Sequence, residues 1–324
     1  MLHRFAKFVA GCTVLLLLAG SLVTSTDSGL SVPDWPTTYG WNMFTFPPSK
    51  WVGGILYEHG HRLIASSVGF LTIVLAIWLW MSEPRRWMRW LGVGALGAVI
   101  AQGVLGGLTV MFFLPAPIST AHAGLAEIFF CMTVAIALFT SRGWLDAGPG
   151  QIVNDSSLRR LATTTTILIY CQILVGATMR HTGAGLAIPD FPLMFGHLWP
   201  THWDPKIAVH FAHRAGALLV AVGVCATVVA VFRQTTVGEL RRPAILLVAL
   251  VCVQITLGAF TVLSKRDVWI NSVHVVCGAL VLTTSLVLTL RTWRGKFARQ
   301  VRSVRLQADP VRLKPDTTYG KASA

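Results

Sequence analysis

Charged residues are scarce in this chain. Asp, Glu, Lys and Arg make up only 12% of its 324 residues, whereas hydrophobic residues make up 54%. Soluble domains carry about twice that share of charged residues. Together with a mean hydropathy of +0.63, this composition excludes an ordinary soluble domain and indicates an integral membrane protein.

Paired cysteines are lacking as well. The chain has six cysteines, none in a Cys-x-x-Cys pair and all inside apolar stretches: Cys12, Cys131, Cys171, Cys225, Cys252 and Cys277. Cysteine in such surroundings usually acts as a small buried hydrophobic residue. The sequence therefore gives no reason to expect a disulfide in the loops.

Long apolar runs, by contrast, are abundant. Eight of them can be marked, at roughly 7–25, 61–81, 90–113, 119–140, 160–179, 207–232, 243–263 and 271–290. Each is close to the ~20 residues that a helix needs to cross ~30 Å of hydrocarbon. Backbone groups in lipid must be satisfied internally, which favours helices for runs of this length. We predict an all-α integral membrane protein with eight transmembrane helices.

Acidic residues are few, so the net charge is +14. When successive connections are assigned to alternate sides of the membrane, 20 of the 27 Lys and Arg residues fall on the side of the two termini. Loops rich in Lys and Arg stay in the cytoplasm, so both termini are predicted to be cytoplasmic. Topology, with some attraction to anionic lipid, explains the positive charge, and no nucleic-acid partner is expected.

The second half of the chain repeats the first. His61 and His213 are 152 residues apart, and the same 152 residues separate His122 from His274. Three further residues recur at this offset: Gln102 as Gln254, Gly106 as Gly258 and Thr109 as Thr261. Each half holds four apolar runs, an even number, so both copies would enter the membrane from the same side as a parallel internal repeat.

This repeat predicts two tandem four-helix bundles, a scaffold that builds cofactor sites from facing side chains. The N-terminal bundle would cover residues 1–145 and the C-terminal bundle residues 146–290. Residues 291–324 are basic and lack apolar periodicity, so we expect them to form a disordered cytoplasmic tail.

Two loops on the predicted outer side also match each other. The first reads SGLSVPDWP over residues 28–36, and the second reads AGLAIPDFP over residues 184–192. Their Gly and Pro residues indicate turn-rich structure. The loops would either cap a pocket or anchor aromatic side chains in the headgroup layer.

The four repeated histidines lie near the predicted outer ends of their runs. Histidine at membrane depth is costly unless it has a partner or a function. A zinc site needs three or four donors, whereas a porphyrin iron needs one or two axial ligands from opposite sides. We therefore expect two haem sites, one between His61 and His122 and one between His213 and His274. The alternative is a structural role, because the small residues nearby also permit close helix packing.

The residues around the histidine pairs differ between the halves. Glu58 stands where the second half has His210, and a carboxylate at that point could move protons or stabilise positive charge. Arg62 and Arg214 follow the helix histidines directly and could bind haem propionates or extend to the headgroups. The remaining polar candidates are of lower interest: Glu127 is an intramembrane carboxyl, and His59, His181, His197 and His202 are expected at the surface.

This set of motifs resembles the haem A synthase family, membrane enzymes that oxidise haem O to haem A for terminal oxidases. The resemblance covers about residues 8–290 and rests on five motifs: GLSVPDWP at 29–36, Glu58-x-x-His61-Arg62, His122, His213-Arg214 and His274. It implies that His61 and His122 hold the substrate haem O, with Glu58 as the catalytic carboxylate. It also implies that His213 and His274 ligate the iron of a resident haem b.

The resemblance further implies an enzyme of the bacterial cytoplasmic membrane that converts a porphyrin methyl group to a formyl group in successive oxidations. Haem O synthase, cytochrome oxidase assembly proteins and further copies of the chain would be its partners. One departure stands out. Many bacterial members have a cysteine pair in the first outer loop, where this chain has Val32 and Thr38.

Two other functions remain open from the sequence. A di-haem b-type membrane cytochrome would need the same four histidines but no catalytic Glu58. A haem-handling assembly factor would use the bundles as carriers. Glu58, and its replacement by His210 in the second half, favour the enzyme.

Overall fold

The computed structural model describes residues 1–146, 155–234 and 237–308, and nearly all of its regular structure is helical. The helices are α1 Leu2–Ser25, α2 Gly54–Ser82, α3 Arg86–Met111, α4 Ala116–Phe139, α5 Arg142–Leu145, α6 Ser156–His181, α7 Pro205–Gln234, α8 Gly238–Leu263 and α9 Val268–Ala308. All except the short α5 are long and apolar enough to cross a membrane. The prediction of an all-α membrane protein with eight spanning helices is thus confirmed.

Helix α6 begins before its apolar run, and a polar residue caps its first turn. The side chain of Asp155 caps α6 by accepting hydrogen bonds from the backbone N–H groups of Ser157 and Leu158. This satisfies amides that have no partner inside the helix. Helix α2 starts at Gly54, where a Cβ atom would lie 2.1 Å from the Ser31 hydroxyl, so the first loop can approach the helix closely.

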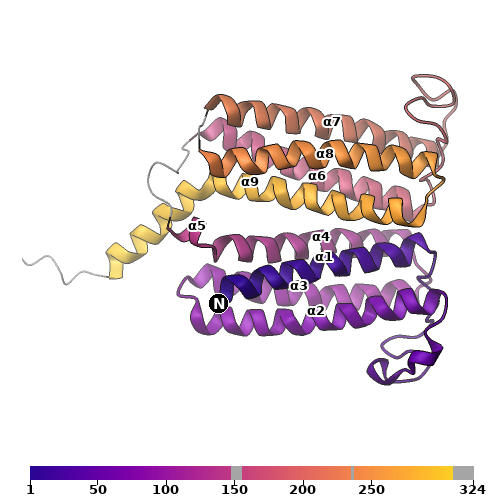
Figure 1. The fold of residues 1–324 in the computed structure, drawn as a ribbon, viewed down its shortest axis with the longest axis horizontal. Coiled ribbons are helices and arrows are strands. Elements are labelled where there is room, and N and C mark those ends of the chain that lie inside the picture. Colours follow the sequence, from indigo (N-terminus) through magenta and orange to yellow (C-terminus); the bar gives the residue numbers. More distant parts are fainter. Residues whose placement is uncertain (147–154, 235–236, 309–324) are drawn as a thin grey trace, which may run out of the picture.

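The long helices form two groups that lie side by side (Figure 1). Within the first group, α1 contacts α2, α2 contacts α3, α3 contacts α4, and α4 closes the ring against α1. Helices α6, α7, α8 and α9 form a second ring in the same way. In each ring the second and fourth helices are therefore opposite each other. The division into two tandem repeat domains stays a prediction.

Helices α4 and α9 lie at the centre of the molecule. Half of the most apolar window of each is buried, compared with 17–28% for the other six spanning helices. The groups meet where α1 and α4 contact α9 and where α4 contacts α6. Contacts with helices of both groups explain why these two helices are more buried than the other six.

The two ends of the molecule differ in structure. We call the end with the long loops 26–53 and 182–204 the loop end, and the end with the N-terminus and α5 the terminal end (Figure 1). The loop end is turn-rich, with two short 3₁₀ helices in the first loop, η1 Met43–Thr45 and η2 Pro48–Lys50. All four repeated histidines lie in the second or third turn of helices that start at the loop end.

The C-terminal segment is more ordered than the sequence predicts. Helix α9 runs to Ala308, so residues 291–308 are helical where the sequence predicted disorder. The side chain of Arg294 forms an ion pair of 2.9 Å with Glu239 of α8, and it donates to the backbone oxygens of Gly143 and Trp144 at α5. These tertiary partners stabilise a helix that has no apolar periodicity. Residues 309–324 lie outside the described residues.

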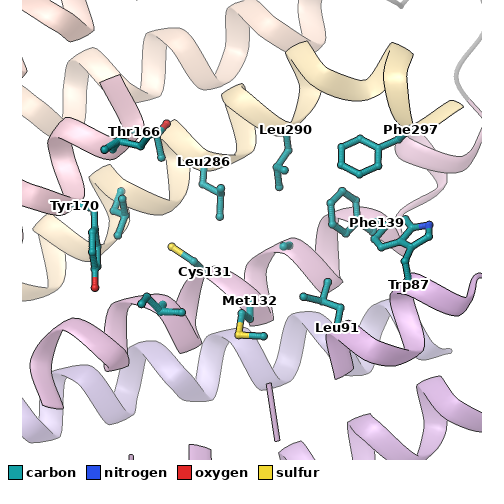
Figure 2. A pocket seen from close by; sticks show the side chains of 14 residues that line it. Trp87, Leu91, Cys131, Met132, Phe139, Thr166, Tyr170, Leu286, Leu290 and Phe297 are labelled. Atoms are coloured by element: carbon teal, nitrogen blue, oxygen red, sulfur yellow. The ribbon is translucent and has the colours of Figure 1, made fainter. Parts of the chain in front are cut away.

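A cavity of about 680 Å³ separates the two groups at mid-depth and towards the terminal end (Figure 2). Its lining is almost entirely apolar and comes from α3, α4, α6 and α9: Trp87, Leu91, Ile128, Cys131, Met132, Ala135, Phe139, Thr166, Ile167, Tyr170, Leu282, Leu286, Leu290 and Phe297. None of the four repeated histidines lines it, so this cavity is distinct from the candidate site.

Candidate functional site

Each repeated histidine packs against a glycine on a neighbouring helix. A Cβ atom on Gly20 of α1 would lie 3.0 Å from Cε1 of His61, and one on Gly176 of α6 would lie 2.8 Å from Cε1 of His213. The α4 and α9 histidines repeat the arrangement: Gly106 of α3 faces His122 at 3.3 Å, and Gly258 of α8 faces His274 at 3.1 Å. Any larger residue at these four positions would displace an imidazole ring.

The histidines of each pair stand on opposite helices of one ring. His61 is on α2 and His122 on α4, and His213 and His274 repeat this on α7 and α9. All four side chains are partly exposed, yet Nδ1 of His61, His122 and His274 is buried without a hydrogen-bond partner. The accessible part of these three rings is therefore away from Nδ1, which leaves the Nε2 edge for a ligand.

Glutamine side chains contact two of the four histidines. Gln102 donates to the backbone oxygen of His122 at 3.0 Å. Gln172 donates to the backbone oxygen of His213 at 2.7 Å, and its Nε2 also lies 3.0 Å from His213 Nδ1. His213 is thus the one repeated histidine with a hydrogen-bonded Nδ1 among the described residues. A contact of this type fixes the orientation of a ligand ring.

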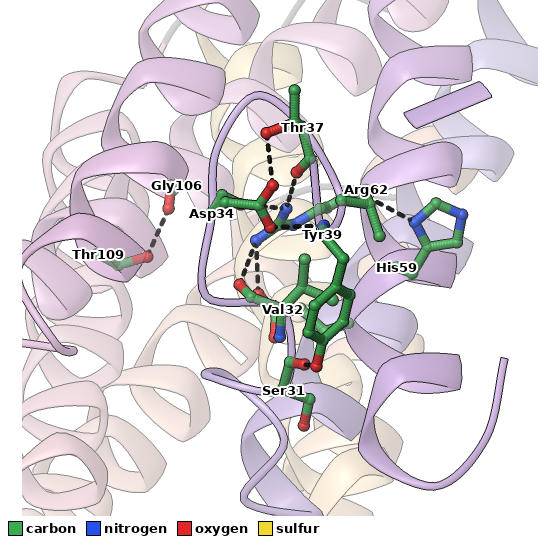
Figure 3. A network of polar contacts seen from close by, with 11 residues as sticks. Ser31, Val32, Asp34, Thr37, Tyr39, His59, Arg62, Gly106 and Thr109 are labelled. Carbon is green, nitrogen blue, oxygen red and sulfur yellow. Dashed lines mark hydrogen bonds and ion pairs between the residues drawn. The ribbon is translucent and has the colours of Figure 1, made fainter. Parts of the chain in front are cut away.

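Glu58 is bound to the first loop and not free in a pocket, beside the contacts between Arg62 and this loop that Figure 3 shows. Its Oε2 accepts a hydrogen bond of 2.8 Å from the backbone N–H of Val32, and its Oε1 lies 2.7 Å from Nη2 of Arg62. Arg62 also donates to three loop carbonyls, those of Val32, Asp34 and Thr37, at 2.8–3.0 Å. The Glu58–Arg62 pair therefore fastens the loop to α2.

The second half contains the same contacts with histidine in place of the carboxylate. The backbone N–H of Ile188 lies 3.2 Å from Nδ1 of His210, and Nε of Arg214 lies 3.1 Å from Nε2 of His210. Arg214 donates to the carbonyls of Ile188, Asp190 and Leu193. The two arginines considered for haem propionates are therefore engaged with the loops in this structure.

An aspartate closes the turn of each loop. The side chain of Asp34 accepts hydrogen bonds from the backbone N–H groups of Tyr39 and Gly40 and from the Thr37 hydroxyl. Burial by itself would raise the pKa of Asp34, but these three donors together lower it below its ordinary value. The pKa of Asp190 is lowered chiefly by the backbone N–H of Gly196. Both turns therefore favour an ionised carboxylate.

The structure corrects one of the surface assignments. His59 was expected at the surface but is fully buried on α2, where its Nδ1 lies 3.2 Å from the Thr38 hydroxyl and its ring packs against Phe46 and Trp51. The folded first loop covers this face of the helix, which the sequence pattern did not show. His181 is half-buried at the end of α6, and His197 and His202 are exposed as predicted.

Glu127 is a buried carboxyl on α4, and its Oε2 has no hydrogen-bond partner. The nearby Tyr170 hydroxyl donates to the backbone oxygen of Gly124 at 3.3 Å. This hydroxyl is therefore not donated to Glu127.

Several residues of the site were missed by sequence reasoning. Gly20 and Gly176 face the α2 and α7 histidines, Gln172 holds His213, and Arg180 joins α6 to α1. The repeat offset of 156 between Gly20 and Gly176 was a usable signal. Gln172 and Arg180 have no counterpart in the first half, where Leu16 and Thr24 stand, so no repeat pointed to them.

The paired imidazoles fit a flat group with a central metal. Such a group needs donors from opposite sides and walls of small residues. The histidines on opposite helices, the buried unpartnered Nδ1 atoms of three of them and the glycine contacts meet this requirement. The fold and site define a polytopic helical membrane protein with two histidine pairs that could each hold a metalloporphyrin.

Comparison with known proteins identifies the group within this class. Residues 3–286 match the COX15-CtaA family, described as cytochrome oxidase assembly protein. The chain is 29% identical to the heme A synthase of Halalkalibacterium halodurans over 91% of this chain and 99% of that protein. It is 30% identical to the heme A synthase of Symbiobacterium thermophilum over 83% of this chain and 89% of that protein. The chain belongs to the COX15-CtaA family.

Proposed function

We propose that this protein is a haem A synthase that oxidises a methyl group of haem O to a formyl group, giving haem A. The observation that carries the proposal is the pair of matched imidazole sites, each built on opposite helices against glycine. The relatives named heme A synthase, which align over most of their length, support the reaction.

We assign different tasks to the two pairs. His61 and His122 would hold the iron of the substrate haem O, and His213 and His274 would ligate a resident haem b. Two asymmetries support this division. Only the first half has the carboxylate Glu58 beside its pair, and only the second half has a glutamine on the histidine ring, at His213. A ring held by a second residue suits a cofactor that stays bound.

The proposed oxidation consumes water and releases protons and electrons. Conversion of the methyl group to an alcohol, R–CH₃ + H₂O → R–CH₂OH + 2H⁺ + 2e⁻, is followed by a second two-electron step to the hydrated aldehyde. A resident haem, when bound, supplies one-electron transfer away from the substrate.

Glu58 is the residue of this chain best placed to take part in the oxidation of the methyl group. It lies three positions before His61, so both side chains share one face of α2. Its carboxylate could stabilise positive charge that develops at the methyl carbon, or accept a proton at Oε2 from the attacking water. In this structure both carboxylate oxygens of Glu58 accept hydrogen bonds, one from the Val32 N–H and one from Arg62. To act on the substrate, Oε2 would have to release the Val32 N–H and turn to the reacting group.

A di-haem b-type cytochrome is the second candidate, because one observation favours it. Glu58 makes the same loop contacts as His210, so its carboxylate has a structural role that needs no reaction. In this case both pairs would hold permanent haems. A carrier of haem for oxidase assembly would use the same sites without oxidation.

The proposal includes a location and an orientation. The protein would lie in the bacterial cytoplasmic membrane with both termini in the cytoplasm, which places the loop end and the histidine pairs towards the outside. The excess of Lys and Arg on the terminal side supports this orientation. Haem O synthase, oxidase assembly proteins and further copies of the chain are the proposed partners.

Pigment extraction tests the function directly. The full chain is produced in a bacterium that makes haem O but has no haem A synthase, and the extracted haems are separated by chromatography. Haem A is expected only in cells with the protein. If ample haem O accumulates and no haem A or alcohol intermediate forms, the enzyme is excluded and the cytochrome becomes the better explanation.

A further inference from the structure

Arg180 is a partly buried cation that the proposed reaction does not yet use. It lies in the last turn of α6, and its Nη2 donates to the backbone oxygen of Ser21 and the hydroxyl of Ser25, both at 2.8 Å. Both acceptors belong to α1. Its Nε is buried without a hydrogen-bond partner. The guanidinium has five N–H donors. It thus bridges the two helical groups through Nη2, while the Nε donor has no partner.

No carboxylate among the described residues forms an ion pair with Arg180. Asp27, whose charge acts on Arg180, instead lies 3.7 Å from Arg266 at the surface. A partly buried guanidinium whose Nε is shielded from solvent and has no partner is unfavourable at membrane depth. The environment of Arg180 is therefore incomplete until an anion from outside the chain is bound.

The position of Arg180 relates it to the second histidine pair. The hydroxyl of Ser25 also lies 3.1 Å from Nδ2 of Asn271 and 2.9 Å from the hydroxyl of Ser272, both near the start of α9. His274 follows two residues after Ser272 on this helix. The guanidinium is thus held next to the start of the helix that supplies one candidate ligand.

Only the second half of the chain has an arginine at this position, next to the pair His213 and His274. Gly20 and Gly176 occupy the same register, since each packs on a histidine of the next spanning helix. Four residues further on, the first half has Thr24 where the second half has Arg180. A need for helix packing common to both halves therefore does not explain the arginine.

We propose that Arg180 binds a propionate carboxylate of the haem held between His213 and His274. The inference rests on the proposed function, because it requires a haem at that pair. Arginine binds carboxylates through two parallel N–H donors, and Nε is available for this purpose. A positive charge beside the haem also favours reduced over oxidised iron, so Arg180 raises the reduction potential of the resident haem.

Esterified haem provides the first test. Haem-free full-length protein is titrated with haem b and with its dimethyl ester, in which both propionates are neutral. The wild type is expected to prefer the acid by roughly 10–100-fold, the effect of hydrogen bonds to a charged group. Arg180→Gln should abolish most of this preference, whereas Arg180→Lys should keep a good part of it. If Arg180→Gln does not fold, Arg180→Thr, which copies position 24, replaces it.

Two matched variants distinguish propionate binding from a purely structural role of Arg180 in joining α6 to α1. Arg266→Gln removes a positive charge at the same end from an arginine that pairs with Asp27, and Ser25→Ala removes the hydroxyl that joins the helices. Both should keep the wild-type preference for the acid. An unchanged preference in Arg180→Gln, or an equal loss in Ser25→Ala, overturns the proposal.

The reduction potential gives an independent readout. The midpoint potential of the bound haem should fall in Arg180→Gln and stay close to wild type in Arg180→Lys and Ser25→Ala. An equal potential in wild type and Arg180→Gln contradicts the charge effect. If His213→Ala binds haem as well as the wild type does, the resident site itself is wrong, and the inference fails with it.

Discussion

Nη2 of Arg62 lies 2.7 Å from Oε1 of Glu58, one helical turn away on α2. The matching contact in the second half joins Arg214 to His210 at 3.1 Å. A carboxylate accepts at both oxygens, whereas a neutral imidazole has a single acceptor nitrogen. Glu58 can therefore satisfy both Arg62 and the Val32 N–H, while His210 can accept fully from only one of its two neighbours. The two loops are therefore bound to their helices by contacts in matching positions, through a carboxylate in the first half and an imidazole in the second.

Replacement of Glu58 by Gln separates catalysis from loop attachment. Glutamine keeps the side-chain size and one acceptor oxygen but removes the charge. If Glu58 serves the reaction, haem A formation should fall by about 10²–10⁴-fold, the usual effect of losing an acid–base or electrostatic group, with haem O or the alcohol accumulating. Chromatography of extracted haems measures this. Near-normal haem A in Glu58→Gln cells would remove the residue from the mechanism.

The histidine variants test which half keeps the resident haem. His213→Ala or His274→Ala should abolish the low-spin b-type spectrum of the purified protein, because two imidazoles give six-coordinate iron. His61→Ala should leave most of that spectrum in place. Optical spectra of detergent-purified variants, with matched protein amounts, provide the comparison. The opposite pattern would exchange the roles of the two halves.

The glycine behind His213 should be intolerant of substitution. In Gly176→Ala the added Cβ would lie 2.8 Å from the ring, so the imidazole must move and haem content should fall severalfold. Gly11→Ala on α1 is the matched control, because nothing lies within 4 Å of its Cβ. Alanine there should be neutral or slightly stabilising, since glycine weakens helices. Equal haem content in both variants would disprove the tight contact.

The first loop should loosen in acid. Its Asp34 has a pKa below the ordinary 3.8, so the stabilisation is present above that value and is lost as the pH falls through the lower folded pKa. Limited proteolysis of the loop between pH 6 and pH 3 should show increasing cleavage with an acid-stable protease. Asp34→Asn should be cleaved readily at every pH. A wild-type loop with no pH dependence would contradict the role of the carboxylate.

The topology can be checked with reporter fusions. An enzyme active only in the cytoplasm, fused after Ala308, should be active, and a reporter active only outside should be silent at this position. The same outside reporter inserted in the loop 182–204 should be active. Activity of the outside reporter at the C-terminal fusion would reverse the proposed orientation.

The sequence by itself determined the class of protein and the main candidates. Eight apolar runs can satisfy their backbone in lipid only as helices, and the 152-residue offset singled out His61, His122, His213 and His274. These inferences needed only composition and spacing, because helix formation in a membrane depends on local hydropathy.

The tertiary structure decided what the side chains contact. Glu58 and Arg62 are fastened to a loop more than twenty residues away in the chain, His59 is buried because that loop folds over it, and Arg180 reaches Ser25 on another helix. Arg294 of α9 likewise pairs with Glu239, which lies 55 residues earlier in the chain. Contacts of this kind depend on how helices and loops are arranged in three dimensions, and no hydropathy pattern along the chain encodes that arrangement.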